Sequence, residues 1–232
     1  MIELRPYREL GGARHGWLDT RHHFSFADYH DSQRIQWGDL RVWNDDTIAP
    51  HSGFPRHPHH DMEIITYVRK GAITHQDSLG NRGRTDAGNV QVMSAGTGIA
   101  HSEVNEEDET TQIFQIWIMP NVSGLPPTWG TRPFPRGERS GSFVTLASGM
   151  PGDAEALPIR ADARMAAATL QAGQNAEYHI AAGRKVYLVP AAGRIEVNGV
   201  VAATGDGIAV RDEQLLQISA QEDSEIVLVD VR

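Results

Sequence analysis

Two short segments of the chain carry side chains that bind metals, and both use the same spacing. His57 and His59 are separated by one residue, and so are His101 and Glu103. Side chains two residues apart on a β-strand point to the same face, so each pair can aim at one point. Three imidazoles and one carboxylate suit a borderline transition-metal ion. The sequence therefore predicts one metal site between two neighbouring strands.

The sequence around both pairs is typical of β-strands. Residues 63–68 (EIITYV) follow the first pair, and residues 89–93 (NVQVM) precede the second. The small residues 94–98 (SAGTG) then form a turn in which the backbone can approach its neighbours closely. The chain has 11 histidines, so a solvated surface pair that arose by chance is the alternative. The strand context favours the metal.

Short apolar runs continue through the whole chain, separated by Gly, Pro, Asn and Asp, and helical periodicity is scarce. This predicts an all-β protein, and 232 residues suffice for two β-barrel or sandwich domains. We expect a metal-binding barrel at residues 1–120, a linker at 121–142 and a second barrel without paired ligands at 143–232. The expected linker includes residues 124–135 (GLPPTWGTRPFP), where four of the 12 prolines disfavour a strand ladder.

Composition excludes several classes of protein. The absence of cysteine rules out disulfides, thiolate metal sites and cysteine nucleophiles. A net charge of −9 argues against direct binding to nucleic acid, which depends on clustered Lys and Arg. No apolar run approaches the ~18 residues of a membrane span. The charged first ten residues lack the apolar core of a signal peptide, so we expect a cytoplasmic protein without membrane contact.

Several segments resemble the pirins, a family of the cupin superfamily. The similarity is dense in the first half of the chain, and the form HPHHDMEI is most similar to short bacterial pirin-like quercetin 2,3-dioxygenases. The matching segments are residues 21–29 (RHHFSFADY), 40–46 (LRVWNDD), 53–68 (GFPRHPHHDMEIITYV), 77–83 (DSLGNRG), 94–103 (SAGTGIAHSE) and 115–120 (QIWIMP). The resemblance implies a monomeric bicupin, two double-stranded β-helix barrels of which only the first holds a metal.

The resemblance also implies which residues hold that metal. The family's ligand positions fall on His57, His59, His101 and Glu103. In cupins generally the glutamate ligand comes a few residues after His-x-His, where this chain has Glu63. Glu63 also has the same odd-numbered parity as His57 and His59, which would turn it to their face of a continuous strand. We assign Glu103 as the ligand because of the pirin match and its i, i+2 relation to His101, and expect Glu63 to support the site without touching the metal. Ligation by Glu63 is the alternative.

The implied cofactor is one divalent transition metal, with iron first and nickel, manganese, cobalt, zinc or copper as alternatives. The implied reaction is cleavage of a flavonol such as quercetin by O₂ with release of CO, for which Glu103 is the predicted catalytic base. Phe26 and Phe54 lie in loop-like sequence. They are candidates for lining the entrance of a pocket for a planar substrate, whereas packing in the core is the expected role of most aromatic residues in this half of the chain.

Two other functions stay open from the sequence. One is a non-catalytic, metal-bearing interaction protein of the pirin type that binds a protein partner. The other is a different cupin activity, such as isomerisation or lyase chemistry, at the same Lewis acid. Histidines outside the two pairs are expected to pack in the core or at the surface. Among them, His75 could face either side of its segment.

Overall fold

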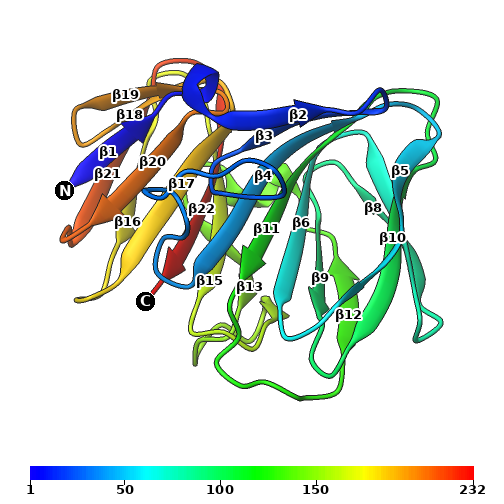
Figure 1. Cartoon of the computed structure of the whole chain (residues 1–232). Coiled ribbons are helices and arrows are strands. Elements are labelled where there is room, and N and C mark those ends of the chain that lie inside the picture. The colour runs from blue at the N-terminus through cyan, green and yellow to red at the C-terminus, as the bar shows by residue number, and fades with distance from the viewer.

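The computed structural model describes residues 1–232, and almost all of its regular structure is β-strand. Its 22 strands form four sheets, which are arranged as two sandwiches side by side (Figure 1). Each sandwich combines a seven-stranded sheet with a four-stranded sheet. This confirms the predicted all-β architecture of two barrels.

The N-terminal barrel holds both histidine pairs. Its large sheet has the order β12 (Thr128–Arg132), β9 (Val90–Ser94), β6 (Glu63–Lys70), β11 (Thr111–Ile118), β4 (Leu40–Ile48), β3 (Leu18–His22) and β2 (Gly11–Arg14). Its small sheet has the order β5 (Ser52–His59), β10 (Ile99–Asn105), β7 (Ala72–Asp77) and β8 (Arg82–Asp86). The two predicted ligand pairs therefore lie on adjacent strands, β5 and β10.

The C-terminal barrel repeats this arrangement. Its large sheet has the order β1 (Ile2–Arg5), β20 (Gly207–Arg211), β17 (Lys185–Ala192), β22 (Ser224–Val231), β15 (Arg164–Leu170), β13 (Val144–Ser148) and β14 (Leu157–Pro158). Its small sheet has the order β16 (Asn175–His179), β21 (Leu215–Ala220), β18 (Arg194–Val197) and β19 (Val200–Ala203). The helical segments are two 3₁₀ turns, η1 (Tyr7–Glu9) and η2 (Arg136–Arg139). Neither has the length or the apolar character that crossing a membrane requires.

Alternation along β11 shows how one strand serves two cores. Ile113, Gln115 and Trp117 point into the N-terminal barrel, whereas Phe114 and Ile116 point toward the other barrel. Phe114 and Ile116 belong to a core cluster of 26 buried residues that the two large sheets share. Full burial of one such side chain contributes roughly 1.5–3 kcal/mol, so this shared core holds the barrels together.

The segment expected to be a linker has more structure than its composition predicted. Its residues 128–132 form β12, which extends the N-terminal large sheet by pairing with β9. Its η2 turn places Arg139 between the barrels, where Nη2 donates hydrogen bonds to Tyr67 Oη at 2.8 Å and to Glu225 Oε1 at 3.0 Å. The composition hid this strand because the prolines flank a proline-free run of five residues, TWGTR.

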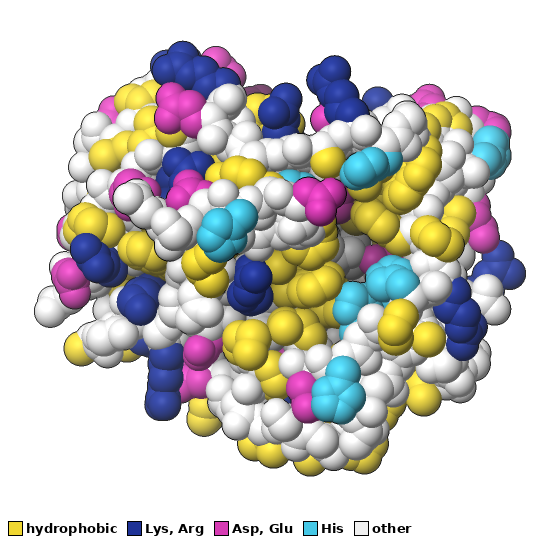
Figure 2. Space-filling model, viewed as in Figure 1, with side chains coloured by type: hydrophobic (Ala, Val, Ile, Leu, Met, Phe, Trp, Pro, Cys, Tyr) yellow, Lys and Arg dark blue, Asp and Glu magenta, His cyan; other side chains and the backbone are white.

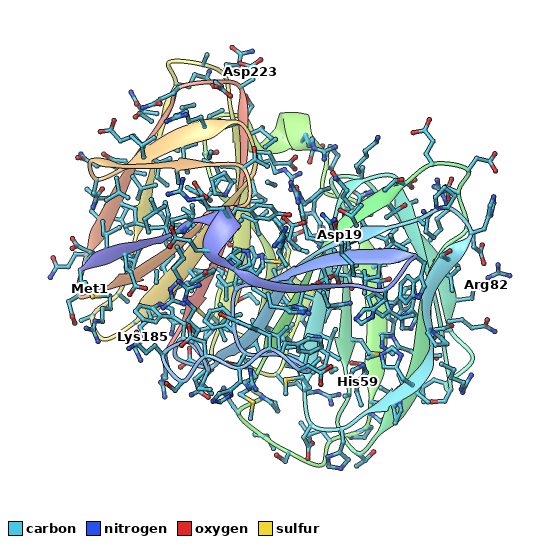
Figure 3. All side chains as sticks on the ribbon, turned by 45° about the horizontal axis from the view of Figure 1, so that its top comes forward. Met1, Asp19, His59, Arg82, Lys185 and Asp223 are labelled. Carbon is cyan, nitrogen blue, oxygen red and sulfur yellow. The ribbon has the colours of Figure 1, made fainter.

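The first strand also differs from the expected domain of residues 1–120. β1 pairs with β20 and so belongs to the C-terminal barrel, and Met1 lies on the same side as Lys185 (Figure 3). The Arg5 guanidinium lies 5.4 to 5.6 Å from the ring centres of Phe24, Trp37 and Tyr187, where cation–π attraction holds the strand in place. The sequence of β1 contains no local pattern that predicts its pairing with a strand about 200 residues further along the chain.

Candidate metal centre

The structure brings the three predicted histidine ligands together inside the N-terminal barrel. β5 and β10 pair so that His57 lies opposite His101, and His59 follows on the same face of β5. The imidazole centres are 4.7 Å apart for His57 and His59, 4.6 Å for His57 and His101, and 4.9 Å for His59 and His101. One ligand nitrogen from each ring lies within 4.8 Å of the others. A single cation between them would reach all three.

The protonation state of these imidazoles suits a metal. Burial, reinforced by the neighbouring histidines, lowers the pKa of His59 and the pKa of His101 to about 4, so both are neutral at pH 7. His57 Nδ1 lies 2.7 Å from the carbonyl oxygen of Pro55 and donates to it, which leaves Nε2 as a bare acceptor. His101 Nε2 is buried and has no hydrogen-bond partner. An orphaned buried nitrogen beside two neutral imidazoles fits a transition-metal ion.

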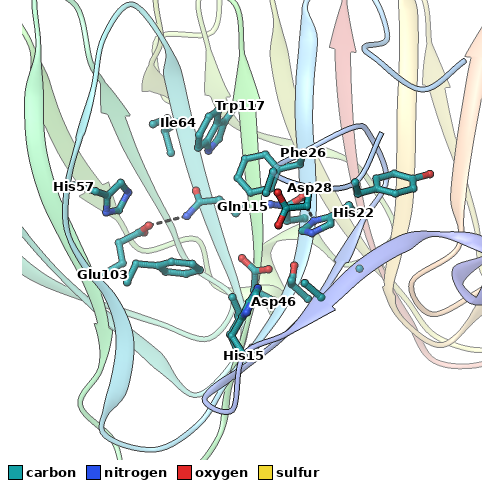
Figure 4. Close-up of a pocket in the computed structure, with 18 of the residues that line it drawn as sticks. His15, His22, Phe26, Asp28, Asp46, His57, Ile64, Glu103, Gln115 and Trp117 are labelled. Carbon is teal, nitrogen blue, oxygen red and sulfur yellow. Dashed lines mark hydrogen bonds between the residues drawn. The ribbon is translucent and has the colours of Figure 1, made fainter. Parts of the chain in front are cut away.

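Glu103 is buried next to this cluster and is held by three side chains. Thr66 Oγ1 and Gln91 Nε2 donate to its Oε1 at 2.7 and 2.6 Å. Gln115 Nε2 donates to its Oε2 at 2.6 Å, the bond marked in Figure 4. Burial alone would raise the pKa of Glu103, but His101 and the hydrogen bonds outweigh it and lower the pKa below its ordinary value. The result is an ionised, oriented carboxylate. The close cluster of ligand atoms comprises only the histidines, so ligation by Glu103 stays a prediction.

The structure does not bring Glu63 to the imidazoles. Its Oε2 accepts hydrogen bonds from Ser94 Oγ at 2.6 Å and from the Arg160 backbone N–H at 3.1 Å. The next residue, Ile64, lines the barrel interior, so Glu63 faces the opposite side of β6. Shared odd numbering with His57 misled the sequence argument, because a turn and a change of sheet separate β5 from β6. Glu63 therefore supports the junction between the barrels.

A cavity of about 600 Å³ opens onto His57 and His59, within the size range of small-molecule sites. It appears as a hollow bordered by hydrophobic and histidine side chains in Figure 2. Phe26 and Phe54, the two predicted pocket residues, both line it. The other lining residues that matter here are His22, Asn44, Asp46, His57, His59, Glu103, Gln115 and Trp117. Ring contacts of Trp117 with Phe26 at 5.4 Å and with His59 at 5.0 Å make one wall aromatic.

The end of the cavity beyond Glu103 is polar, and sequence reasoning missed it. Asp46 is 2% exposed, and burial, together with the charges of Asp45 and Glu103, raises its pKa to about 7. Beside it, His22 Nδ1 lies 2.8 Å from Asn44 Oδ1, and all three side chains line the cavity. Figure 4 shows Asp46 and His22 at this end. The alternation of β4 carried the signal, because Asn44 and Asp46 are two residues apart within the segment LRVWNDD.

His75, whose direction the sequence left open, faces into the barrel. It is fully buried on β7 and its ring centre lies 5.1 Å from that of His101. It is not part of the three-histidine cluster. Because it contacts His101, a predicted ligand, His75 is a neighbour of the metal centre. The sequence had suggested only a packing role for it.

Two similar β-barrels with convergent histidines inside one of them define a bicupin with a single candidate metal centre. The family model described as Pirin matches residues 3–118, and the model described as the quercetinase C-terminal cupin domain matches residues 145–231. The chain belongs to the pirin family. The resemblance seen in the sequence is thereby confirmed.

Relatives of known name and structure agree with this. A Pseudomonas aeruginosa protein, whose name proposes quercetin 2,3-dioxygenase activity, is 68% identical over 231 residues and covers 100% of both chains. The Escherichia coli K12 protein named quercetin 2,3-dioxygenase is 43% identical, covering 100% of this chain and 99% of its own. The crystal structure of the bacterial pirin YhhW from Escherichia coli with nickel(II) aligns with a TM-score of 0.93 at 42% identity, covering 100% of this chain and 99% of that one. The nickel-bound relative and the histidine cluster together support one divalent metal.

Proposed function

We propose that this protein is a metal-dependent dioxygenase that cleaves flavonols such as quercetin with O₂ and releases CO. The observation that carries the proposal is the cavity of about 600 Å³, which is lined by His57, His59 and Glu103 at the three-histidine cluster. It is large enough for a three-ring planar substrate and has one aromatic wall. The name of the Escherichia coli K12 relative supports the same reaction.

His57, His59, His101 and Glu103 would hold the metal, with iron as the first choice among divalent ions. Neutral imidazole nitrogens and one carboxylate are donors that suit iron, nickel, manganese, cobalt and zinc alike. When bound, the metal supplies a Lewis acid that makes a flavonol hydroxyl acidic. The three donors around Glu103 keep its carboxylate ionised and aimed, which favours binding a cation.

The walls of the cavity would orient the substrate. Phe26 and Trp117 meet edge to face at 5.4 Å, and Phe54 contributes a third ring from β5, so a flat aromatic molecule finds apolar contact. At the far end, the Asp46 carboxyl group is placed to accept a hydrogen bond from a phenolic hydroxyl. This combination selects planar polyphenols over aliphatic ligands.

Glu103 would accept the proton that the flavonol hydroxyl loses. His101 and the hydrogen bonds to Glu103 lower the pKa of this carboxyl group despite its burial, so it is a weak base and takes a proton only from a hydroxyl that is already acidic in the site. The buried surroundings of Glu103 exclude bulk water from this transfer. A flavonol whose 3-hydroxyl is methylated should therefore bind without turnover.

The test is oxygen uptake and CO release by the metal-loaded protein with quercetin. We expect turnover in the wild type and its loss in His101→Ala, while His51→Ala, which changes an exposed histidine paired with Asp108, retains it. Metal content is measured for all three proteins. Metal-loaded wild type that leaves quercetin intact in air would refute the dioxygenase and favour the metal-bearing interaction protein.

A further inference from the structure

A chain of three buried side chains runs from β7 to the metal centre. Asp77 Oδ2 lies 3.0 Å from His75 Nε2, and His75 Nδ1 lies 3.3 Å from His101 Nδ1. These three residues are 4%, 0% and 2% exposed, so water does not compete for their hydrogen bonds. We propose that Asp77 and His75 are positioning residues that fix the tautomer of His101, so that its Nε2 lone pair faces the metal.

The direction of each hydrogen bond follows from the carboxylate. Burial raises the pKa of Asp77, but hydrogen bonds from His75 and Asn81 outweigh it and lower the pKa below its ordinary value. An ionised carboxylate only accepts, so His75 donates to it from Nε2, and a ring with that single proton has a bare acceptor at Nδ1. His101 must then donate from Nδ1. Its remaining nitrogen, Nε2, is the buried atom without a partner.

Neighbouring residues hold this hydrogen-bonded relay of Asp77, His75 and His101 in place. The His75 ring stacks on Trp129 from β12, with centres 4.8 Å apart and planes 9° from parallel. Asp77 is anchored by the backbone N–H groups of Leu79 at 2.9 Å and Asn81 at 3.1 Å. Neither the imidazole nor the carboxylate can therefore turn away without breaking other contacts. Outer residues of this kind typically change metal affinity by about 10- to 100-fold.

His57 shows that the same result is reached in another way on the neighbouring strand. Its Nδ1 donates to the Pro55 carbonyl oxygen at 2.7 Å, and a carbonyl can only accept. His101 has an imidazole in that place instead, which can donate or accept. The carboxylate of Asp77 removes that ambiguity. The inference rests on the metal-ligand part of the proposed function and is independent of the substrate.

The test compares two replacements of His75. In His75→Asn the side-chain oxygen can still accept from His101 Nδ1, whereas His75→Phe keeps a flat ring against Trp129 but offers no acceptor. We expect nickel(II) affinity, measured by chelator competition on the metal-free protein, to fall about 10- to 100-fold in His75→Phe and to stay within about threefold of wild type in His75→Asn. Thermal melting of each variant reports whether the fold is kept.

A second measurement needs neither metal nor activity. Long-range ¹H–¹⁵N NMR of the metal-free protein distinguishes the two imidazole tautomers, and we expect protonated Nδ1 at His101 in wild type and in His75→Asn. Asp77→Asn presents an N–H donor to His75, which reverses the relay and should shift the His101 proton toward Nε2. These spectra also serve if His75→Phe fails to fold.

The outcomes separate this inference from the proposed function. If the wild type does not bind nickel, the metal site itself is refuted. If the wild type binds nickel while His75→Phe and Asp77→Asn bind it equally well and keep the proton on Nδ1 of His101, the relay is refuted and the metal site stands. Inactivity toward quercetin affects neither result.

Discussion

The two barrels have the same sheet order, yet only one keeps space inside. In the N-terminal small sheet, His101 of β10 lies opposite His57 of β5. On the strands that take the same places in the C-terminal small sheet, Leu216 of β21 lies opposite Tyr178 of β16. The C-terminal interior is one apolar cluster of 17 buried residues, whereas the N-terminal interior has two small clusters, of five and four, with the site between them.

The difference shows what a site costs a β-barrel. Where the C-terminal barrel packs Leu and Ile, the N-terminal barrel must satisfy buried polar groups, as it does for Glu103 with Thr66, Gln91 and Gln115. Burying a polar group without such partners costs about 1–3 kcal/mol. The shared core of 26 residues lets the apolar barrel stabilise the polar one. The C-terminal barrel thus serves as a support, and the N-terminal barrel, which has the same fold, provides the binding site.

The largest expected effect, on metal affinity, comes from replacing His101 with leucine, the type of residue that Leu216 provides in the C-terminal barrel. His101→Leu removes one metal ligand, so we expect nickel(II) to bind at least about 1,000-fold more weakly, or about 4 kcal/mol, and quercetin turnover to stop. In the metal-free variant, loss of the unpartnered Nε2 is offset by His75 Nδ1, which loses its donor, so we expect the free energy of unfolding to change by less than about 3 kcal/mol. Nickel titration and urea unfolding measure the two effects. Undiminished nickel binding would disprove the assignment of His101.

The reverse experiment weakens the supporting barrel. Leu216→Ala opens a cavity in the C-terminal core and should lower the free energy of unfolding by about 3 kcal/mol. Nickel affinity should be unchanged, because no part of the site lies in that barrel. Urea unfolding of the metal-free protein and nickel titration decide this. A parallel loss of nickel affinity would mean that the barrels are coupled more tightly than their cores suggest.

The polar end of the pocket should make stability depend on pH. The pKa of Asp46 is raised to about 7 in the folded protein, from an ordinary value of 3.8. The folded state therefore holds a proton that the unfolded state releases, so this contribution is present at low pH and is lost as pH rises toward 7. Between pH 5 and pH 7 we expect wild type to lose on the order of 2 kcal/mol relative to Asp46→Asn, which stays neutral. Urea unfolding with chelator present, at both pH values, measures it; a difference independent of pH would contradict the raised pKa.

The smallest effect concerns the aromatic wall. Phe54→Leu keeps an apolar side chain but loses ring contact, so we expect KM for quercetin to rise about fivefold, or about 1 kcal/mol, with kcat nearly unchanged. Phe143→Leu is the matched control, because Phe143 packs edge to face on Tyr178 in the other barrel. Steady-state oxygen uptake compares the two. Equal KM values for both variants would place the substrate elsewhere.

The sequence predicted what depends on short-range rules and missed what depends on long-range pairing. His57 with His59, and His101 with Glu103, are two residues apart on single strands, so alternation alone placed each pair on one face. Glu63 failed the same reasoning because parity does not carry across a turn into another sheet. The roles of Asp46 and His75 depend on which strands surround the cavity. That is set by pairing between distant segments, which no local pattern records.

The placement of β1 and β12 has a consequence for anyone who would divide this chain. A fragment that ends at residue 120 would carry β1 without β20 and leave the outer edge of β9 bare. The complementary fragment would expose the edge of β20 in the same way. Bare edges of this kind recruit other chains into aggregates. Each half of the chain supplies an edge strand to the barrel of the other half, so the protein is expressed and purified best as one intact chain.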